Sequence, residues 1–408
     1  MLKTLGAQIK EFKKDSFLTP VFMILEVLME TIIPLMMASI IDNGVEAGDI
    51  HHIYVMGGCM VIVACVSLFA GTMGGKYGAR ASAGFARNLR KAMYENIQTF
   101  SFSNIDKFST AGLVTRLTTD VTNLQNAYQM LLRMCVRAPI SLVCAMIMAF
   151  FINAKLACVY LIAVIVLGVI LAFITIRAHH YFMEVFPKYD DLNASVQENV
   201  SAIRVVKAYV REDYEKKKFT QASKNIYNMF VKAEGVLAFN SPVMQIAVYS
   251  CIIALSWLGA KMIVAGSLTT GELMSLLTYC MNIMMSLMML SMVFVMLAMS
   301  IASAERICEV LNEKSDITNP ENPVYEVADG SVTFDHVTFR YNKTSDKPIL
   351  DDINLTIHSG ETIGVIGGTG SSKSSLVNLI SRLYDVSDGA VLVGGKDVRS
   401  YDLDTLRD

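Results

Sequence analysis

One stretch of this chain decides how its C-terminal part folds: Gly367-Gly368-Thr369-Gly370-Ser371-Ser372-Lys373-Ser374. It follows a continuous apolar run at residues 362–366, which predicts a buried parallel strand, and it precedes helical apolar spacing over residues 374–383. Glycines between a strand and a helix let backbone N–H groups converge on phosphate oxygens, and the helix N-terminus adds its positive dipole end. The stretch therefore predicts a loop that binds the phosphates of a nucleotide.

The motif assigns roles to individual side chains. Lys373 is expected to contact the β- and γ-phosphates, and Ser374 is expected to supply a hydroxyl oxygen to Mg²⁺, which makes it the predicted metal ligand. ATP and Mg²⁺ are the cofactors that fit these roles. The predicted binding residues of the loop are Gly367, Gly368, Thr369, Gly370, Ser371, Ser372, Lys373, Ser374 and Ser375.

Ser372 departs from the general motif, which has glycine immediately before the lysine. A Cβ at this position would crowd the phosphates or oppose the backbone angles that glycine takes. A serine is small and polar, however, and could be accommodated. We expect nucleotide binding to be retained, and weakened binding is the alternative.

The region around the motif has the composition of a soluble domain. Residues 332–341 alternate apolar and polar side chains like a strand, and further strands are predicted at residues 352–357 and 390–393. A polar segment with Pro320 and Pro323 precedes them and is typical of a linker. The predicted domains are residues 1–311, a linker at 312–329, and a partial α/β nucleotide-binding domain at 330–408.

The first 311 residues have a different character. The 408-residue chain is 53% hydrophobic and 18% charged, with a mean hydropathy of +0.44, and its apolar runs lie in this part. A membrane-spanning helix needs roughly 20 apolar residues. Six such spans predict an all-α polytopic membrane domain: residues 17–41, 54–75, 131–152, 156–176, 242–264 and 273–301. The net charge of −2 offers no electrostatic footprint for nucleic acid.

Lysine and arginine predict the orientation of these spans. Four lysines precede the first span, and residues 42–52 contain neither Lys nor Arg, whereas residues 76–130 and 177–240 are rich in both. Both termini are therefore expected in the cytoplasm. The two long loops predict helical hairpins that extend the spans into the cytosol, each tipped by a short transverse helix, and ordinary solvated loops are the alternative.

Charged residues occur within the spans. Glu26 and Glu30 share one helix face in the first span, and Arg133 and Arg137 have the same spacing in the third. The helical rise places Glu26 and Arg137 at similar depth. We expect that these residues pair, or that the glutamates line a cavity for cationic amphiphiles; a purely structural polar contact between helices is the alternative.

Over its whole length the chain resembles a bacterial half-transporter of the ATP-binding cassette exporter family, of the multidrug and lipid type. The resemblance rests on Gly367–Ser375, Phe339-Arg340-Tyr341, Ser303-Ala304-Glu305-Arg306-Ile307 and Ser359-Gly360-Glu361. It implies that Tyr341 stacks on adenine and that residues 103–112 and 210–214 are the coupling helices. It also implies a plasma-membrane location and a second half-transporter as partner, with a heterodimer favoured by Glu26-Val27-Leu28-Met29-Glu30 and Ile41-Asp42-Asn43-Gly44.

The function implied by this resemblance is ATP-driven export of a hydrophobic or amphipathic substrate, such as a drug, lipid or peptide. Members of the family continue with a glutamine loop, a Leu-Ser-Gly-Gly-Gln signature, an Asp–Glu strand and a switch histidine, and this sequence ends at Asp408 before them. We therefore expect no catalytic residue here, and no ATP turnover by this chain alone. The alternatives are an inactive or regulatory membrane subunit, or an importer that uses the exporter-like fold.

Overall fold

The computed structural model of the chain describes residues 1–341 and 347–408, apart from ten side chains inside two helices: His179, Phe182, Met183, Phe186, Pro187, Asp190, Ala194, Val295, Ala298 and Met299. The described chain forms two compact units. The first comprises Met1–Ile9, Phe85–Leu124 and Ala302–Asp408, and the second comprises Lys10–Gly84 and Gln125–Ile301.

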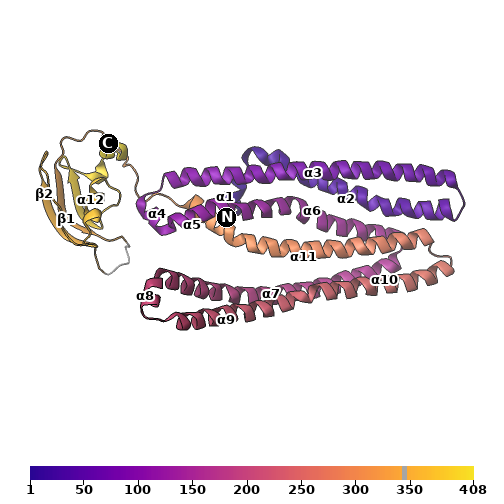
Figure 1. Ribbon diagram of the computed structural model, residues 1–408. Coiled ribbons are helices and arrows are strands. Elements are labelled where there is room, and N and C mark those ends of the chain that lie inside the picture. The colour runs from indigo at the N-terminus through magenta and orange to yellow at the C-terminus, as the bar shows by residue number, and fades with distance from the viewer. Residues whose placement is uncertain (342–346) are drawn as a thin grey trace. The chain divides into compact units, whose positions relative to one another are not determined.

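Long helices build the second unit (Figure 1). They are α2 (Lys13–Ser39), α3 (Ile50–Gln98), α6 (Val121–Ile152), α7 (Ala154–Ser201), α9 (Glu212–Ala238), α10 (Asn240–Val264) and α11 (Thr270–Asn312). A π-helical segment, Ile40–Val45, follows α2, and the short helix α8 (Ile203–Ala208) lies between α7 and α9. Helices α3, α6 and α11 each continue into the first unit.

The predicted six-span membrane domain is confirmed. Six helical stretches of the described chain are long and apolar enough to cross a membrane: Lys10–Val45, Ile50–Gln98, Thr110–Ile152, Ala154–Ala178, Glu212–Val264 and Thr270–Phe294. Large apolar side chains such as Phe151 and Ile176 remain exposed on them. A helix that is apolar on all sides has lipid as its solvent, because its backbone polar groups are satisfied within the helix.

Helices α6, α7, α10 and α11 share an apolar core in the second unit. Two fully buried tyrosines in this core donate hydrogen bonds to backbone carbonyls of other helices. The Tyr160 hydroxyl lies 2.7 Å from the carbonyl of Leu276, and the Tyr279 hydroxyl lies 2.7 Å from that of Thr31. A hydroxyl buried without a partner is costly, so these bonds connect α7 to α11 and α11 to α2 at defined positions.

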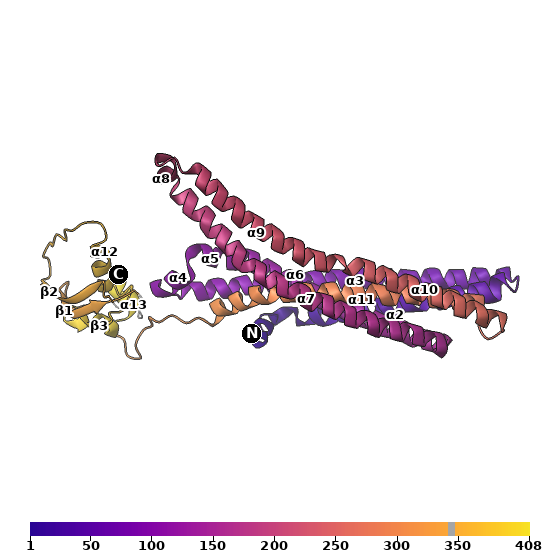
Figure 2. The ribbon, with the colours of Figure 1, turned by 90° about the horizontal axis from the view of Figure 1, so that it is seen from below.

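Helices α7 and α9 run side by side, as both views show (Figures 1 and 2), and this confirms the predicted hairpin over residues 177–240. Its short helix is α8, however, and not the predicted 210–214, which is wrong. Three acidic side chains, Glu212, Asp213 and Glu215, occupy the first turn of α9, where the helix dipole favours them. These acidic residues favour a start of α9 at Glu212. The short helix at the tip of the hairpin, α8, therefore lies before residue 210 and not at 210–214.

The first unit contains α1 (Leu2–Ala7), the short helices α4 (Phe102–Phe108) and α5 (Thr110–Thr115), and a small sheet. Helices α4 and α5 overlap residues 103–112, the first of the two segments expected to be coupling helices. Ser101 begins α4 as a capping box: its side chain accepts from the Asn104 N–H, and the Asn104 side chain accepts from the Ser101 N–H. This reciprocal cap explains why a new helix begins there.

The sheet of the first unit has the order β2-β1-β3-β4, and all its pairings are antiparallel. Its strands are β1 (Val332–Phe339), β2 (Leu350–Ile357), β3 (Asp388–Val393) and β4 (Lys396–Asp397), and it is joined by α12 (Lys373–Ile380) and α13 (Leu403–Arg407). Phe334, Phe339 and Tyr401 are almost fully buried in its core. The predicted strands around residues 332–341, 352–357 and 390–393 are thereby confirmed.

The apolar run at residues 362–366 forms no strand, so that prediction is wrong for the described chain. Its side chains are exposed, and Ile366 is 97% exposed. A buried parallel strand needs a neighbouring parallel strand and a helix over its face. The described sheet is antiparallel throughout and offers this run no such neighbour.

Candidate nucleotide-binding site

The glycine-rich loop leads directly into α12, as the motif predicts, and Ser372 is the N-cap residue of that helix. The Lys373 ammonium folds back over the loop. It donates to the carbonyls of Gly367 and Gly368, each at 2.8 Å, and to the Ser371 hydroxyl at 3.1 Å. The Lys373 ammonium therefore lies at the N-terminus of α12, and a phosphate group could replace the oxygen atoms that now accept its hydrogen bonds.

The glycines of the loop are needed for its backbone path. Gly370 has a φ of +88°, a region that side chains disfavour, and a Cβ on Gly367 would lie 2.5 Å from the Ser371 hydroxyl oxygen. The space beside Gly368 and Gly370 is open to 4 Å. A ligand can thus approach the backbone of the loop closely.

Ser372 adopts the left-handed conformation, with φ 61° and ψ 22°. The expected conflict between a side chain and glycine-type backbone angles is therefore present at this residue. A non-glycine residue in this region costs about 1–2 kcal/mol. The loop accommodates the serine at that cost, and the effect on nucleotide affinity stays a prediction.

Tyr341 lies beside the helix that follows the loop. Its hydroxyl is hydrogen-bonded to that of Ser375 at 2.9 Å, although 33 residues separate them in the chain. Two aromatic rings meet it nearly edge-on: Phe339, at a centroid distance of 4.8 Å, and Tyr384, at 5.0 Å. The fold thus brings together the residue expected to stack on adenine and the loop expected to bind phosphate.

The residues present fit ATP and Mg²⁺. The loop offers backbone N–H groups, a helix N-terminus and the Lys373 ammonium to phosphate. The exposed Ser374 hydroxyl is a hard oxygen ligand of the kind that Mg²⁺ prefers. The sequence did not identify Tyr384 as part of this cluster, because no motif marks a tyrosine four residues after the end of α12.

A second polar cluster lies in the second unit, where the predicted pairing is confirmed. Arg137 of α6 donates to Glu26 at 2.6 Å and to both carboxylate oxygens of Glu30 at 2.9 Å. Gly71 of α3 makes room for this cluster, since a Cβ there would lie 2.9 Å from a Glu26 carboxylate oxygen. Arg133, one turn earlier on α6, packs its methylene groups near Gly78.

A third cluster fastens the end of α11 within the first unit. Asp120 is 1% exposed and accepts hydrogen bonds from Arg306 at 2.8 and 2.5 Å and from Ser303 at 2.9 Å. Both donors belong to the Ser303–Ile307 segment on which the family resemblance partly rests. A buried carboxylate with a bidentate partner of this kind fixes the geometry of the helix ends that carry it.

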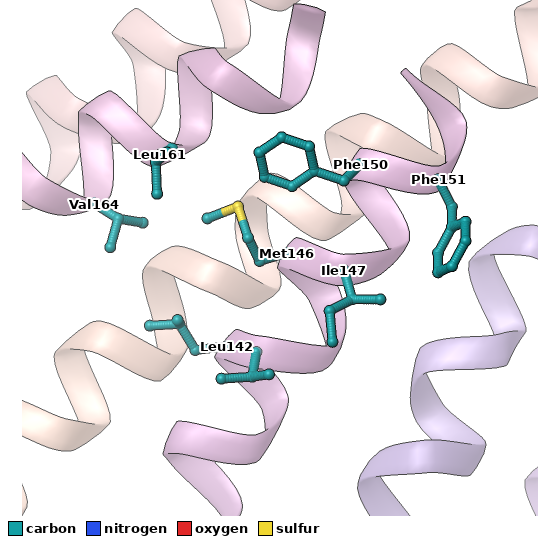
Figure 3. Close-up of a pocket in the computed structure, with 8 residues that line it drawn as sticks. Leu142, Met146, Ile147, Phe150, Phe151, Leu161 and Val164 are labelled. Atoms are coloured by element: carbon teal, nitrogen blue, oxygen red, sulfur yellow. The ribbon is translucent and has the colours of Figure 1, made fainter. Parts of the chain in front are cut away.

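Apolar residues of α6 and α7 line a pocket of about 620 Å³ in the second unit (Figure 3). Met146 and Phe150 of α6 point towards Leu161 and Val164 of α7 in this view. The lining is almost entirely apolar, and its residues lie in two of the six membrane-spanning stretches. The nucleotide loop therefore belongs to the first unit, whereas the pocket belongs to the membrane-spanning stretches of the second unit.

Comparison with known families identifies the family of the chain. Residues 16–288, about two thirds of the chain, match the family described as the ABC transporter transmembrane region, and residues 350–408 match the family described as ABC transporter. The chain therefore belongs to the ATP-binding cassette (ABC) transporters, and it combines their membrane region with part of their ATP-binding domain.

The relatives give the same assignment. The chain is 35% identical to an uncharacterized ABC transporter ATP-binding protein of Mycobacterium tuberculosis strain H37Rv. The alignment extends over 408 residues, which are 100% of this chain and 70% of the relative. The chain is 32% identical over 387 residues to an uncharacterized ABC transporter ATP-binding protein of Bacillus subtilis, covering 95% and 67%. It is also similar to the ATP-dependent lipid A-core flippase of Syntrophus aciditrophicus, with 27% identity over 86% of this chain and 57% of the relative.

Proposed function

We propose that this chain is one half of a dimeric transporter that uses ATP to export a hydrophobic or amphipathic substrate. The observation that carries the proposal is the meeting of Tyr341, Ser375 and the Lys373 loop at one end of α12, in a chain that also has six membrane-spanning stretches. A substrate of the lipid class is supported by two relatives, which are named as a lipid A-core flippase and a fatty acid transporter.

The loop residues would hold the nucleotide as follows. The Lys373 ammonium would exchange its bonds to Gly367 and Gly368 for the β- and γ-phosphates, and the Ser374 hydroxyl would hold Mg²⁺. Tyr341 would offer its half-exposed ring to adenine. Bound Mg-ATP supplies the free energy for transport when a complete pair of ATP-binding domains hydrolyses it.

The arrangement in the membrane follows from the charge distribution. Lysine and arginine are concentrated before the first span and in residues 76–130 and 177–240, which favours cytoplasmic termini. The plasma membrane is the location that the resemblance to bacterial exporters implies. The hairpin of α7, α8 and α9 then projects into the cytosol. A second half-transporter completes the assembly, as a heterodimer or a homodimer.

Titration calorimetry with Mg-ATP tests the nucleotide site. The chain is expected to bind Mg-ATP, and Lys373→Ala is expected to weaken binding at least about tenfold because a charge-assisted phosphate contact is lost. Lys396→Ala, on the exposed end of the sheet, is the matched control and should bind like the parent chain. No binding at millimolar ATP would refute the proposal.

Transport direction tests the rest of the proposal. In inverted vesicles that contain this chain and a complete half-transporter, substrate should accumulate inside in the presence of ATP. Loss of substrate from such vesicles would identify an importer. Nucleotide binding with no effect on transport would identify a regulatory subunit.

A further inference from the structure

Tyr384 stands between the candidate adenine-binding residue and the helix α4 of the same unit. It follows the end of α12 by four residues, so its position depends on the helix that begins at the phosphate loop. Its ring meets Tyr341 at a centroid distance of 5.0 Å and an interplanar angle of 85°, and Phe339 at 5.6 Å. A movement of α12 or of Tyr341 would therefore act directly on Tyr384.

The other side of Tyr384 contacts α4. Its hydroxyl donates to the Asp106 carboxylate at 2.8 Å, and its ring lies 5.9 Å from that of Phe102. Burial and the neighbouring Asp106 carboxylate both raise the pKa of the Tyr384 phenol, so the phenol keeps its proton and remains a donor at neutral pH. A donor bond to a carboxylate is among the stronger hydrogen bonds.

Helix α4 is itself fastened to the segment that follows α11. The Asn104 side chain donates to Glu313 at 2.9 Å, and the Lys107 ammonium donates to the same carboxylate at 2.8 Å. The Ser103 hydroxyl donates to Asp316 at 2.8 Å. Because α11 ends at Asn312, these bonds attach α4 to the chain directly after α11.

We propose that Tyr384 is a positioning residue that links nucleotide occupancy of the loop to α4 through its hydrogen bond to Asp106. The proposal rests on the proposed nucleotide site and adds to it the route by which occupancy leaves that site. The link has two sides, an aromatic contact with Tyr341 and a hydroxyl contact with Asp106, and the two can be changed separately. Removing only the hydroxyl should leave binding intact and disconnect α4.

The test uses hydrogen exchange of the full chain in nanodiscs, read by mass spectrometry on peptides covering residues 102–108. Mg-ATP is expected to change deuterium uptake of these peptides in the parent chain. In Tyr384→Phe the Mg-ATP affinity should stay within about threefold of the parent, and most of the difference at residues 102–108 should be lost. Asp106→Ala removes the acceptor of the same hydrogen bond. It should likewise keep the Mg-ATP affinity and lose most of the difference in deuterium uptake.

Tyr401→Phe is the matched control, because the Tyr401 hydroxyl donates to the Val393 backbone carbonyl within the sheet core and takes no part in the proposed link between Tyr341 and α4. This variant should keep both Mg-ATP binding and the nucleotide-dependent difference at α4. A nucleotide-dependent difference that persists in Tyr384→Phe and Asp106→Ala would overturn the link. Binding in the parent chain without any change at residues 102–108 would overturn the link alone. No Mg-ATP binding by the parent chain would overturn the proposed nucleotide site, and the link with it.

Discussion

The guanidinium of Arg137 lies 2.6 Å from a carboxylate oxygen of Glu26, inside the membrane-spanning part of the chain. The same guanidinium also pairs with Glu30, so one cation serves two carboxylates on one face of α2. Charges at this depth are costly unless they are paired. The cluster therefore connects α2 to α6 by an interaction that neither helix can lose without leaving an unpaired charge in a membrane-spanning stretch.

Replacing Arg137 with methionine should destabilise the protein. Two partly buried carboxylates would lose their shared partner, and the loss should be below the roughly 3–5 kcal/mol that breaking a fully buried ion pair costs. The fluorescence of the single tryptophan, Trp257, can follow thermal unfolding in detergent. Lys155→Met, at an exposed position beside the start of α7, is the control, and an equal melting midpoint for both variants would contradict the prediction.

Two glycines of α3 provide a matched pair of substitutions. Gly→Ala within a helix is stabilising by about 0.5–1 kcal/mol when the new methyl group has space. A Cβ added at Gly75 would meet no atom within 4 Å outside the backbone of its own helix, so Gly75→Ala should raise the free energy of unfolding. Gly71→Ala should lower it, because its methyl group would meet Glu26 at 2.9 Å. Equal changes in the two variants would show that Gly71 makes no room for the cluster.

Ser372→Gly should stabilise the loop by a small amount. Relief of the left-handed strain is worth about 1–2 kcal/mol, and the greater freedom of glycine in the unfolded chain offsets about 0.5–1 kcal/mol of it. Ser372→Ala keeps the Cβ and loses only the hydroxyl, so it should show no such gain. Denaturant unfolding of both variants checks this, and a gain in Ser372→Ala would place the cause in the hydroxyl instead.

The exposed pair His336 and Asp352 should titrate together. Their hydrogen bond, at 2.6 Å, raises the pKa of His336 above its ordinary 6.5 and lowers that of Asp352 below 3.8. The stabilisation by the pair is therefore complete between the ordinary Asp pKa and the ordinary His pKa. It is lost as pH rises through the raised pKa of His336 and as pH falls through the lowered pKa of Asp352. NMR titration of labelled histidine should show a lower His336 pKa in Asp352→Asn, and an unchanged one would refute the coupling.

Several features that a local or periodic pattern encodes could be predicted from the sequence. Apolar length predicted six spans, and the glycine-rich stretch predicted a loop before a helix over residues 374–383; the observed helix α12 begins at Lys373. Helical rise alone placed Glu26 level with Arg137, and the two are in contact. These features depend on residues that are close in sequence or on a regular repeat.

Features that depend on distant partners were not predictable in the same way. The run at residues 362–366 has the composition of a buried strand, but a strand forms only where another strand pairs with it. The contact between Tyr384 and Asp106 joins residues 278 positions apart, and no pattern in either segment indicates it. The tip helix α8 was misplaced because acidic residues after it, and not its own sequence, determine where α9 starts.

The exposed run at residues 362–366 has a practical consequence for handling the protein. Four of its five residues are β-branched and none is charged, and this composition favours pairing with an extended chain. Detergent covers the membrane-spanning helices but has no reason to cover this segment in the first unit. Purified protein should therefore self-associate with rising concentration through its water-facing part, and a charged residue at Ile366 should reduce that aggregation.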